Sequence, residues 1–290
     1  MTKNNKPIPV IINPASGKPK PVLHTISETF RAHNLSWRGH LTYKFGDATQ
    51  FAQEAVADGA EMVVVFGGDG TVLEVVNGVM GSNVIVGILP GGTGNAVATE
   101  LGISRKIEEA AELICTSQNR RAVDVAQVDD QYYLLRAYTG ITQDQAASRE
   151  LKDKYHLMAY PMEVLNVLKD APQAKYTVTV DGKKTEVEAM TCFVNNLDNL
   201  GGVDIDVGSI TPDDGLVDVM IVSKNRHALG EIGHYVLHLG DTKTHSYHAQ
   251  GKVVTVEADP PQTVWLDGEF YSNTPVTIKV HPSAVKIIVP

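Results

Sequence analysis

The pattern of hydrophobic and polar positions changes near residue 121. Before it, short apolar runs alternate with helical patterns, and the runs cover residues 8–13, 37–43, 61–66 and 83–89. Strand and helix in turn are typical of a mostly parallel sheet covered by helices. After Arg121 the pattern predicts mostly strands, interrupted by two helical stretches near 146–169 and 226–239. We therefore expect an α/β domain over residues 1–121 and a predominantly antiparallel β domain over residues 122–283.

Local motifs indicate where the helices of the first half begin and end. Two residue pairs have the spacing of a capping box, Asp47 with Gln50 and Thr71 with Glu74. Gly59 and Gly78 stand where helical patterns stop, and glycine is common just after a last helical turn. These motifs predict helices that start near residues 48 and 71.

Composition and charge narrow the class of protein. The chain has 290 residues, 43% of them hydrophobic and 20% charged, which is typical of a globular protein. The net charge of −9 argues against a nucleic-acid partner. No apolar run approaches the roughly 18 residues that span a bilayer, and the first ten residues lack a signal-peptide core, so we expect a cytoplasmic protein. Cys115 and Cys192 lack metal-type spacing, and we expect both to be reduced thiols.

A glycine-rich turn follows the predicted strand 61–66. Gly67, Gly68 and Gly70 lie between that strand and a helix, so bare backbone N–H groups are expected at the carboxyl end of the strand. Such a turn suits phosphate, since glycine lets the backbone approach closely and the helix start is partly positive. Asp69 stands among these glycines, where a carboxylate would repel phosphate unless it holds a cation or a proton. We therefore expect Asp69 to be functional.

A second turn of the same kind follows the next strand. It contains Gly91, Gly92, Thr93, Gly94 and Asn95 and again leads into a helix, which closes at Gly102. Two neighbouring phosphate-type loops at one sheet edge indicate a nucleotide site. A third candidate, residues 12–20, is not a P-loop, because Ile12 occupies the place of its first glycine and Pro19 follows the lysine.

Several motifs together resemble the diacylglycerol kinase catalytic-domain family, which includes soluble bacterial diacylglycerol kinases, sphingosine kinases and ceramide kinases. The motifs, in chain order, are NPASGK, FGGDGT with EVVNG, LPGGTGNAVATELGI, TPDDGLVDVMIV and WLDGE. The resemblance covers nearly the whole chain. It implies an N-terminal domain like that of NAD kinase, a C-terminal β-sandwich, and ATP and Mg²⁺ as cofactors. It also allows the last strand, about 284–290, to return to the first domain.

The resemblance assigns roles to individual residues. It implies that the nucleotide contacts Asn13, Pro14, Ala15, Ser16, Thr42, Gly67, Gly68, Gly70, Thr71, Gly92, Thr93 and Asn95. It implies metal ligation at the TPDDG turn, by Asp214 with the Leu216 carbonyl and with Asp213 nearby, and at Asp124 through water. Without the resemblance, the sequence TPDDG also fits an ordinary solvent-exposed turn.

Two carboxylates compete for the role of general base. The resemblance places Glu269 of WLDGE there, while Asp69 takes that role in sphingosine-kinase-like members. By its residues alone, WLDGEF is first a hairpin, since Asp267 and Gly268 suit a type I′ turn. Both Glu269 and Asp69 remain catalytic candidates at this stage.

The chain departs from the family pattern at three positions. Leu73 replaces a common asparagine, Ala96 replaces an aspartate as in the sphingosine-kinase branch, and Arg136 replaces a small polar residue. Arg136 belongs to the segment expected near the acceptor, so the identity of the acceptor stays open.

Two further patterns have spacings that could serve a function. His234, His238, His245 and His248 are spaced like zinc ligands, but HYVLH lacks the glutamate of HExxH, so we expect no zinc site. The stretch 149–168 has apolar positions that suit a core-facing helix, with membrane docking or the lining of an acyl pocket as alternatives.

The sequence thus predicts a lipid kinase that transfers the γ-phosphate of ATP to the hydroxyl of diacylglycerol or a related lipid at a membrane surface. A sphingoid base or another long-chain alcohol is the alternative acceptor, and a non-catalytic nucleotide- or lipid-binding protein is the alternative class. An NAD kinase is disfavoured by LPGGTGN. A homodimer is left open.

Overall fold

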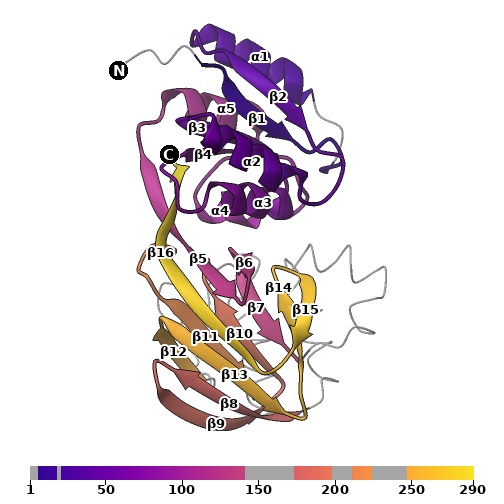
Figure 1. The fold of residues 1–290 in the computed structure, drawn as a ribbon, viewed down its shortest axis with the longest axis vertical. Coiled ribbons are helices and arrows are strands. Elements are labelled where there is room, and N and C mark those ends of the chain that lie inside the picture. Colours follow the sequence, from indigo (N-terminus) through magenta and orange to yellow (C-terminus); the bar gives the residue numbers. More distant parts are fainter. Residues whose placement is uncertain (1–5, 18–20, 141–172, 198–210, 224–246) are drawn as a thin grey trace, which may run out of the picture. The chain divides into compact units, whose positions relative to one another are not determined.

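A computed structural model describes residues 6–17, 21–140, 173–197, 211–223 and 247–290 (Figure 1). The chain divides into two compact units, the first formed by residues 1–123 with 283–290 and the second by residues 124–282.

A parallel sheet forms the centre of the first unit. Its strands are β1 (Ile8–Ile12), β2 (Trp37–Leu41), β3 (Met62–Gly67) and β4 (Ile85–Pro90), in the order β2–β1–β3–β4. The end of β16 (Val276–Ile288) extends this sheet, with Lys286 opposite Ile85 of β4 in parallel register. Residues Val63–Phe66 are all buried, as expected for a parallel strand covered on both faces.

Four helices of the first unit form two pairs that cover this sheet. The helices are α1 (Val22–Ala32), α2 (Asp47–Ala57), α3 (Asp69–Val79) and α5 (Ile107–Thr116), and the short α4 (Ala96–Glu100) stands outside the pairs. Helix α1 packs beside α5, and α2 packs beside α3 (Figure 1). Connections between parallel strands are right-handed. The connection from β1 to β2 runs in one direction across the sheet and the connection from β2 to β3 runs in the other, so α1 and α2 lie on opposite faces.

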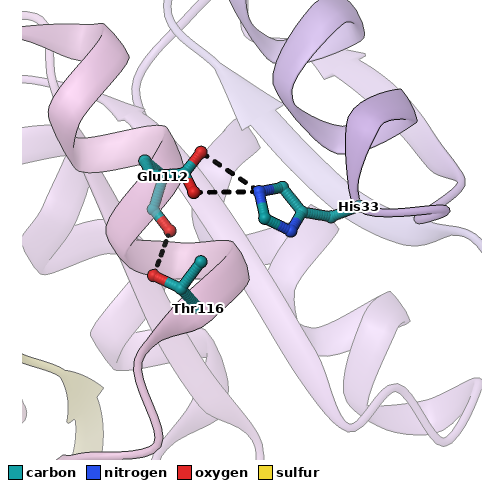
Figure 2. A network of polar contacts seen from close by, with 3 residues as sticks. All are labelled: His33, Glu112 and Thr116. Carbon is teal, nitrogen blue, oxygen red and sulfur yellow. Dashed lines mark hydrogen bonds and ion pairs between the residues drawn. The ribbon is translucent and has the colours of Figure 1, made fainter.

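A surface contact joins the end of α1 to α5. The Glu112 carboxylate lies 3.0 Å from Nε2 of His33, and the Thr116 hydroxyl donates to the Glu112 carbonyl at 2.8 Å (Figure 2). Both side chains of the pair are partly exposed to solvent, so the contact adds little to stability.

Both predicted capping boxes are wrong. Helix α3 begins at Asp69, so Thr71 lies inside it, and α2 begins at Asp47. Glu74 of α3 instead accepts hydrogen bonds from the amides of Gly46 and Ala48, at 2.7 and 3.3 Å, at the start of α2. Burial raises the pKa of Glu74, and its amide contacts oppose that change. A neighbouring helix, which sequence spacing cannot reveal, supplies the cap.

The two glycines predicted to end helices differ in role. Gly59 follows α2 with φ of +70°, as expected after a last helical turn. Gly78 lies within α3, where a Cβ would come 2.5 Å from the Cβ of Ala52 and 2.6 Å from the Thr49 carbonyl of α2. The prediction for Gly78 is wrong, because this glycine serves the close approach of the two helices.

The second unit is a β-sandwich in its described residues. One layer has the order β12–β11–β10–β7–β14–β15, formed by β7 (Arg136–Thr139), β10 (Thr191–Asn195), β11 (Val217–Val222), β12 (Tyr247–Gly251), β14 (Thr263–Leu266) and β15 (Glu269–Asn273). The other layer has β13 (Val253–Asp259) between β16 and β8 (Ala174–Val180), with β9 (Lys183–Ala189) beyond, while β5 (Arg120–Val128) pairs with β16 and β6 (Gln131–Tyr133). The pairings between strands of this unit are antiparallel.

Alternating inward residues of both layers make the core of this unit. Val178 and Val256 from one layer and Val194, Val219 and Leu266 from the other belong to one buried cluster. Such inward alternation is what a two-layer sandwich requires. The predicted fold class, an α/β domain with a mostly parallel sheet followed by an antiparallel β-sandwich, is confirmed.

Some sequence predictions fall outside the described residues. These are the helical stretches near 146–169 and 226–239, the alternatives for 149–168, and His234, His238 and His245. His248 is described and lies 2.8 Å from the buried Asp218 carboxylate. Cys115 and Cys192 are free thiols. Within the described ranges, no helix is long and apolar enough to cross a membrane.

Candidate functional site

Three loops meet at one edge of the parallel sheet. Residues 13–17 follow β1, residues 67–71 follow β3, and residues 91–95 follow β4. These strands are neighbours in the sheet, in the order β1–β3–β4, so their carboxyl ends lie side by side. This edge is where open α/β sheets bind ligands.

Asn13 ties the first loop to the second. Its backbone N–H donates to the Phe66 carbonyl at 2.9 Å, and its side-chain amide donates to the Thr71 hydroxyl at 3.0 Å. Its side-chain oxygen accepts the Ala15 amide at 3.0 Å. Asn13 and Thr71, both predicted to contact the nucleotide, therefore hold the two loops together.

Glycines allow the three loops to approach one another. A Cβ on Gly17, whose φ is +62°, would lie 2.1 Å from the Gly91 carbonyl oxygen, and a Cβ on Gly92 would lie 2.6 Å from the Cα of Gly68. Real Cβ atoms do not come this close, so a side chain at either position would push the loops apart. The Gly91 amide also donates to the Gly67 carbonyl at 2.8 Å.

Asn95 and Asp69 fix the third loop. Asn95 is left-handed, with φ of +51°, and its side chain both accepts the Gly92 amide and donates to the Gly92 carbonyl, each at 2.8 Å. Asp69, the first residue of α3, accepts the Val97 amide of α4 at 3.0 Å. One Asp69 oxygen thus joins the starts of the helices that follow the second and third loops.

The other predicted nucleotide residues lie along the same edge. Thr42 follows β2, is buried, and its amide donates to the Ile12 carbonyl at 3.0 Å. Ser16 and Gly68 are partly buried, whereas Pro14, Ala15, Gly70 and Thr93 are exposed.

Sequence reasoning missed Arg105 as a member of this site. Its guanidinium donates to the carbonyls of Thr93 and Gly94, which are carbonyls of the third loop. A lone arginine ten residues after the end of the loop has no motif spacing, so only the fold brings the two together.

The WLDGE segment of the second unit is a tight hairpin between β14 and β15. Asp267 and Gly268 both have positive φ, +48° and +94°, as the predicted type I′ turn requires. The Asp267 carboxylate accepts the backbone amides of Leu134, Leu135 and Arg136, at 2.8 to 2.9 Å. Burial raises the pKa of Asp267 to about 6, and the amide donors oppose this change.

Asp267 therefore fixes the segment that leads into β7. Sequence reasoning treated Asp267 only as a turn residue. Arg136, the departure from the family pattern, is buried at the start of β7, next to the Asp267 turn. Glu269 is the first residue of β15 and is exposed, so its carboxylate is open to solvent.

The proposed metal residues of the second unit lie around one turn. Asp124 is fully buried, its amide donates to the Pro212 carbonyl at 2.7 Å, and its carboxylate accepts the Gly215 amide at 2.6 Å. The exposed Asp214 accepts the Leu216 amide at 2.9 Å and the Thr211 hydroxyl at 3.1 Å, and Asp213 is exposed beside it. Asp124 thus shapes the turn that presents Asp213 and Asp214.

The donor set fits a hydrated Mg²⁺ rather than a closed cage. Among the described residues, no three His, Cys, Asp or Glu side chains gather as a metal site. Mg²⁺ keeps several waters and often takes only one or two carboxylates. Exposed Asp214 and Asp213 suit that mode of binding, whereas buried Asp124 contributes by holding the turn.

The structure therefore gathers the predicted residues into separate groups. The nucleotide residues and Asp69 lie in the first unit, at the carboxyl edge of its sheet. Glu269 lies in the second unit, as do Asp124, Asp213, Asp214 and Leu216.

Comparison with known proteins agrees with this two-domain architecture. Residues 7–128 match the diacylglycerol kinase catalytic domain, and residues 137–289 match the YegS C-terminal NAD kinase beta sandwich-like domain. A Staphylococcus haemolyticus protein named as a "putative lipid kinase" is 31% identical over 243 residues, 81% of this chain and 78% of the relative. A "putative lipid kinase" of Staphylococcus epidermidis is 27% identical over 259 residues, 86% of this chain and 84% of the relative.

A solved structure is similar over nearly the full length. The crystal structure of a "putative diacylglycerol kinase" from Bacillus anthracis str. Sterne has a TM-score of 0.86 at 28% identity and covers 98% of this chain and 97% of its own. By fold, a diacylglycerol kinase catalytic domain is followed by an NAD kinase beta sandwich-like domain. It belongs to the diacylglycerol kinase catalytic-domain family, whose kinases use ATP.

Proposed function

We propose that this protein transfers the γ-phosphate of ATP to the hydroxyl of diacylglycerol or a closely related lipid. The observation that carries the proposal is the convergence of the loops 13–17, 67–71 and 91–95 at the carboxyl ends of adjacent strands. Glycines close this junction, and a backbone without side chains at a helix start is suited to phosphate oxygens. The similarity to proteins named as lipid kinases points to a lipid acceptor.

The chemistry requires alignment and charge stabilisation more than covalent help. Phosphoryl transfer passes through a loose transition state in which negative charge is spread over oxygens. A base takes the proton of the lipid hydroxyl, the hydroxyl oxygen bonds to the γ-phosphorus, and the bond to the ADP oxygen breaks. Bound Mg²⁺ would neutralise part of the phosphate charge. Separately, we propose a structural Mg²⁺ at the turn of the second unit, held by Asp214 and the Leu216 carbonyl with Asp213 nearby.

We propose Glu269 as the general base and Asp69 as a positioning residue. Glu269 is exposed, on a hairpin that Asp267 fixes to the chain before β7, so a rigid turn presents its carboxylate. Asp69 already uses one oxygen to accept the Val97 amide, and this bond fixes the helix after the third loop. A structural bond of this kind suits a residue that holds the phosphate loops in place.

Substitution of each carboxylate by its amide tests this assignment. We expect Glu269→Gln to lower kcat by at least about 100-fold, while ATP affinity stays within about twofold. Asp69→Asn keeps an oxygen for the Val97 amide, so we expect a smaller loss of kcat. Glu257→Gln, an exposed carboxylate of the same unit, is the matched control.

Two results would contradict the assignment. Normal turnover of Glu269→Gln would remove Glu269 from the reaction. A larger loss of kcat in Asp69→Asn than in Glu269→Gln, with ATP affinity kept in both, would make Asp69 the base.

A further inference from the structure

Two aromatic side chains stand almost fully in solvent on one loop of the first unit. Tyr43 is 86% exposed and Phe45 is 89% exposed, and both belong to the segment between β2 and α2. Lys44 lies between them and is also exposed, and Leu41 at the end of β2 adds a further exposed apolar side chain. A cluster of apolar side chains in contact with water does not stabilise the fold. We therefore expect this cluster to bind a partner.

The backbone of this loop is fixed. The Asp47 carboxylate accepts the amides of Tyr43 and Lys44, at 2.8 and 3.0 Å, and these bonds lower the pKa of Asp47. Glu74 of α3 accepts the Gly46 amide at 2.7 Å, at a residue whose φ is +92°.

Hydrogen bonds at both ends of the loop keep the two rings outside the protein surface. Binding through them costs little conformational entropy, because the backbone is already ordered. The exposure of Tyr43 and Phe45 is therefore built into the fold.

We propose that residues 41–45, here called the aromatic loop, dock on the surface of a lipid bilayer. Tyrosine and phenylalanine rings settle at the boundary between headgroups and acyl chains, and a neighbouring lysine pairs with lipid phosphate. The proposal rests on the proposed function, since an enzyme that acts on a bilayer lipid must reach the bilayer.

Charge distribution favours this unit as the docking side. The first unit contains 12 Lys and Arg against 11 Asp and Glu, whereas the second contains 13 against 23. The net charge of −9 therefore resides in the second unit. Anionic lipid therefore repels the first unit less than the second, which favours insertion of the aromatic rings from the first unit.

A nucleobase is the competing partner for these rings, because Thr42 lies in the same segment. A stacked base is usually held between a ring and a second protein surface. Rings that are 86% and 89% exposed are not covered by the described residues of the first unit. Two free rings on either side of a lysine suit a bilayer better than a base.

Vesicle sedimentation of the full chain tests the proposal. The probe is large vesicles of equimolar phosphatidylcholine and phosphatidylglycerol, without ATP. We expect Tyr43→Ser with Phe45→Ser to lower the vesicle partition coefficient at least about tenfold, with unchanged Tm and ATP affinity. Leu23→Ser is the matched control, since Leu23 is an exposed apolar residue of α1, and we expect its effect to stay within about twofold.

Several outcomes would overturn the proposal. The first is that the wild type does not bind the vesicles, and the second is that the double variant binds them equally well. The third is that the double variant loses ATP affinity but keeps vesicle binding, which would assign the loop to the nucleotide. Phosphate transfer to detergent-dispersed short-chain diacylglycerol is measured in parallel. Vesicle binding that depends on the loop, without such transfer, would support membrane docking by the aromatic loop and contradict the proposed function.

Discussion

At the scale of single residues, Asp267 shows how one side chain acts on two segments. Its positive φ makes the hairpin turn that places Glu269 at the start of β15, and its carboxylate accepts the amides of residues 134–136. The residue that shapes the turn therefore also fixes the chain that enters β7. Arg136, which distinguishes this chain from its family pattern, lies in the segment so fixed.

We predict that Asp267→Ala lowers the free energy of unfolding by about 2–4 kcal/mol, because the backbone amides lose their acceptor. Asp267→Asn keeps one oxygen and should cost less. Thermal and urea unfolding measure both, with the exposed Asp130→Ala as control. Equal stability of Asp267→Ala and wild type would show that water replaces the carboxylate without loss.

Residue roles were the part of the site that the sequence predicted least completely. Glycine spacing identified the second and third loops, because that spacing reflects a backbone requirement local to each loop. The contacts of Asn13 with Thr71, of Asp69 with Val97 and of Arg105 with the third loop span 58, 28 and 11 to 12 positions. No local rule relates residues so far apart, so these contacts emerge only from the fold.

At the scale of elements, the paired helices α2 and α3 explain two wrong predictions together. Gly78 lets α3 approach α2, and Glu74, one turn earlier on α3, accepts the amides at the start of α2. Both residues suit a helix terminus by their local sequence, yet each is used for a contact between helices. The same Glu74 fixes Gly46 and with it the aromatic loop.

Two substitutions within α3 test this packing. Gly78→Ala should destabilise the protein by about 1–3 kcal/mol, because its Cβ would overlap Ala52 and Thr49 of α2. Gly70→Ala in the same helix meets no atom within 4 Å and should leave stability unchanged or raise it by up to about 1 kcal/mol. The two variants are compared by their free energy of unfolding and not by activity, because Gly70 belongs to a proposed phosphate loop. Equal effects of the two substitutions would contradict a packing role for Gly78.

Strand positions were predicted well because their signal is local. The apolar runs at 8–13, 61–66 and 83–89 correspond to β1, β3 and β4, each buried within a parallel sheet. Helix ends were harder, since the cap of α2 comes from α3 and not from its own first turn. Contacts between elements therefore determine where a helix ends, whereas the periodicity of apolar residues predicts the central part of an element.

At the scale of the whole molecule, the chain passes from one unit to the other at β5 and returns along β16. Strand β16 pairs with β13 at one end and with β4 at the other, so its final residues complete the sheet of the first unit. Periodicity predicted an α/β half and a β half. The return of the last strand came only from family resemblance, because pairing between residues about 200 positions apart leaves no local pattern.

The central claim is that the protein phosphorylates a lipid hydroxyl, and transfer of labelled γ-phosphate from ATP tests it most directly. Wild type and Glu269→Gln are incubated with diacylglycerol, sphingosine, ceramide, a long-chain alcohol and NAD, the lipids in mixed micelles. We predict label in diacylglycerol or a close relative with wild type and at least about 100-fold less with Glu269→Gln. Label in NAD, or ATP binding without label in any acceptor, would contradict the claim.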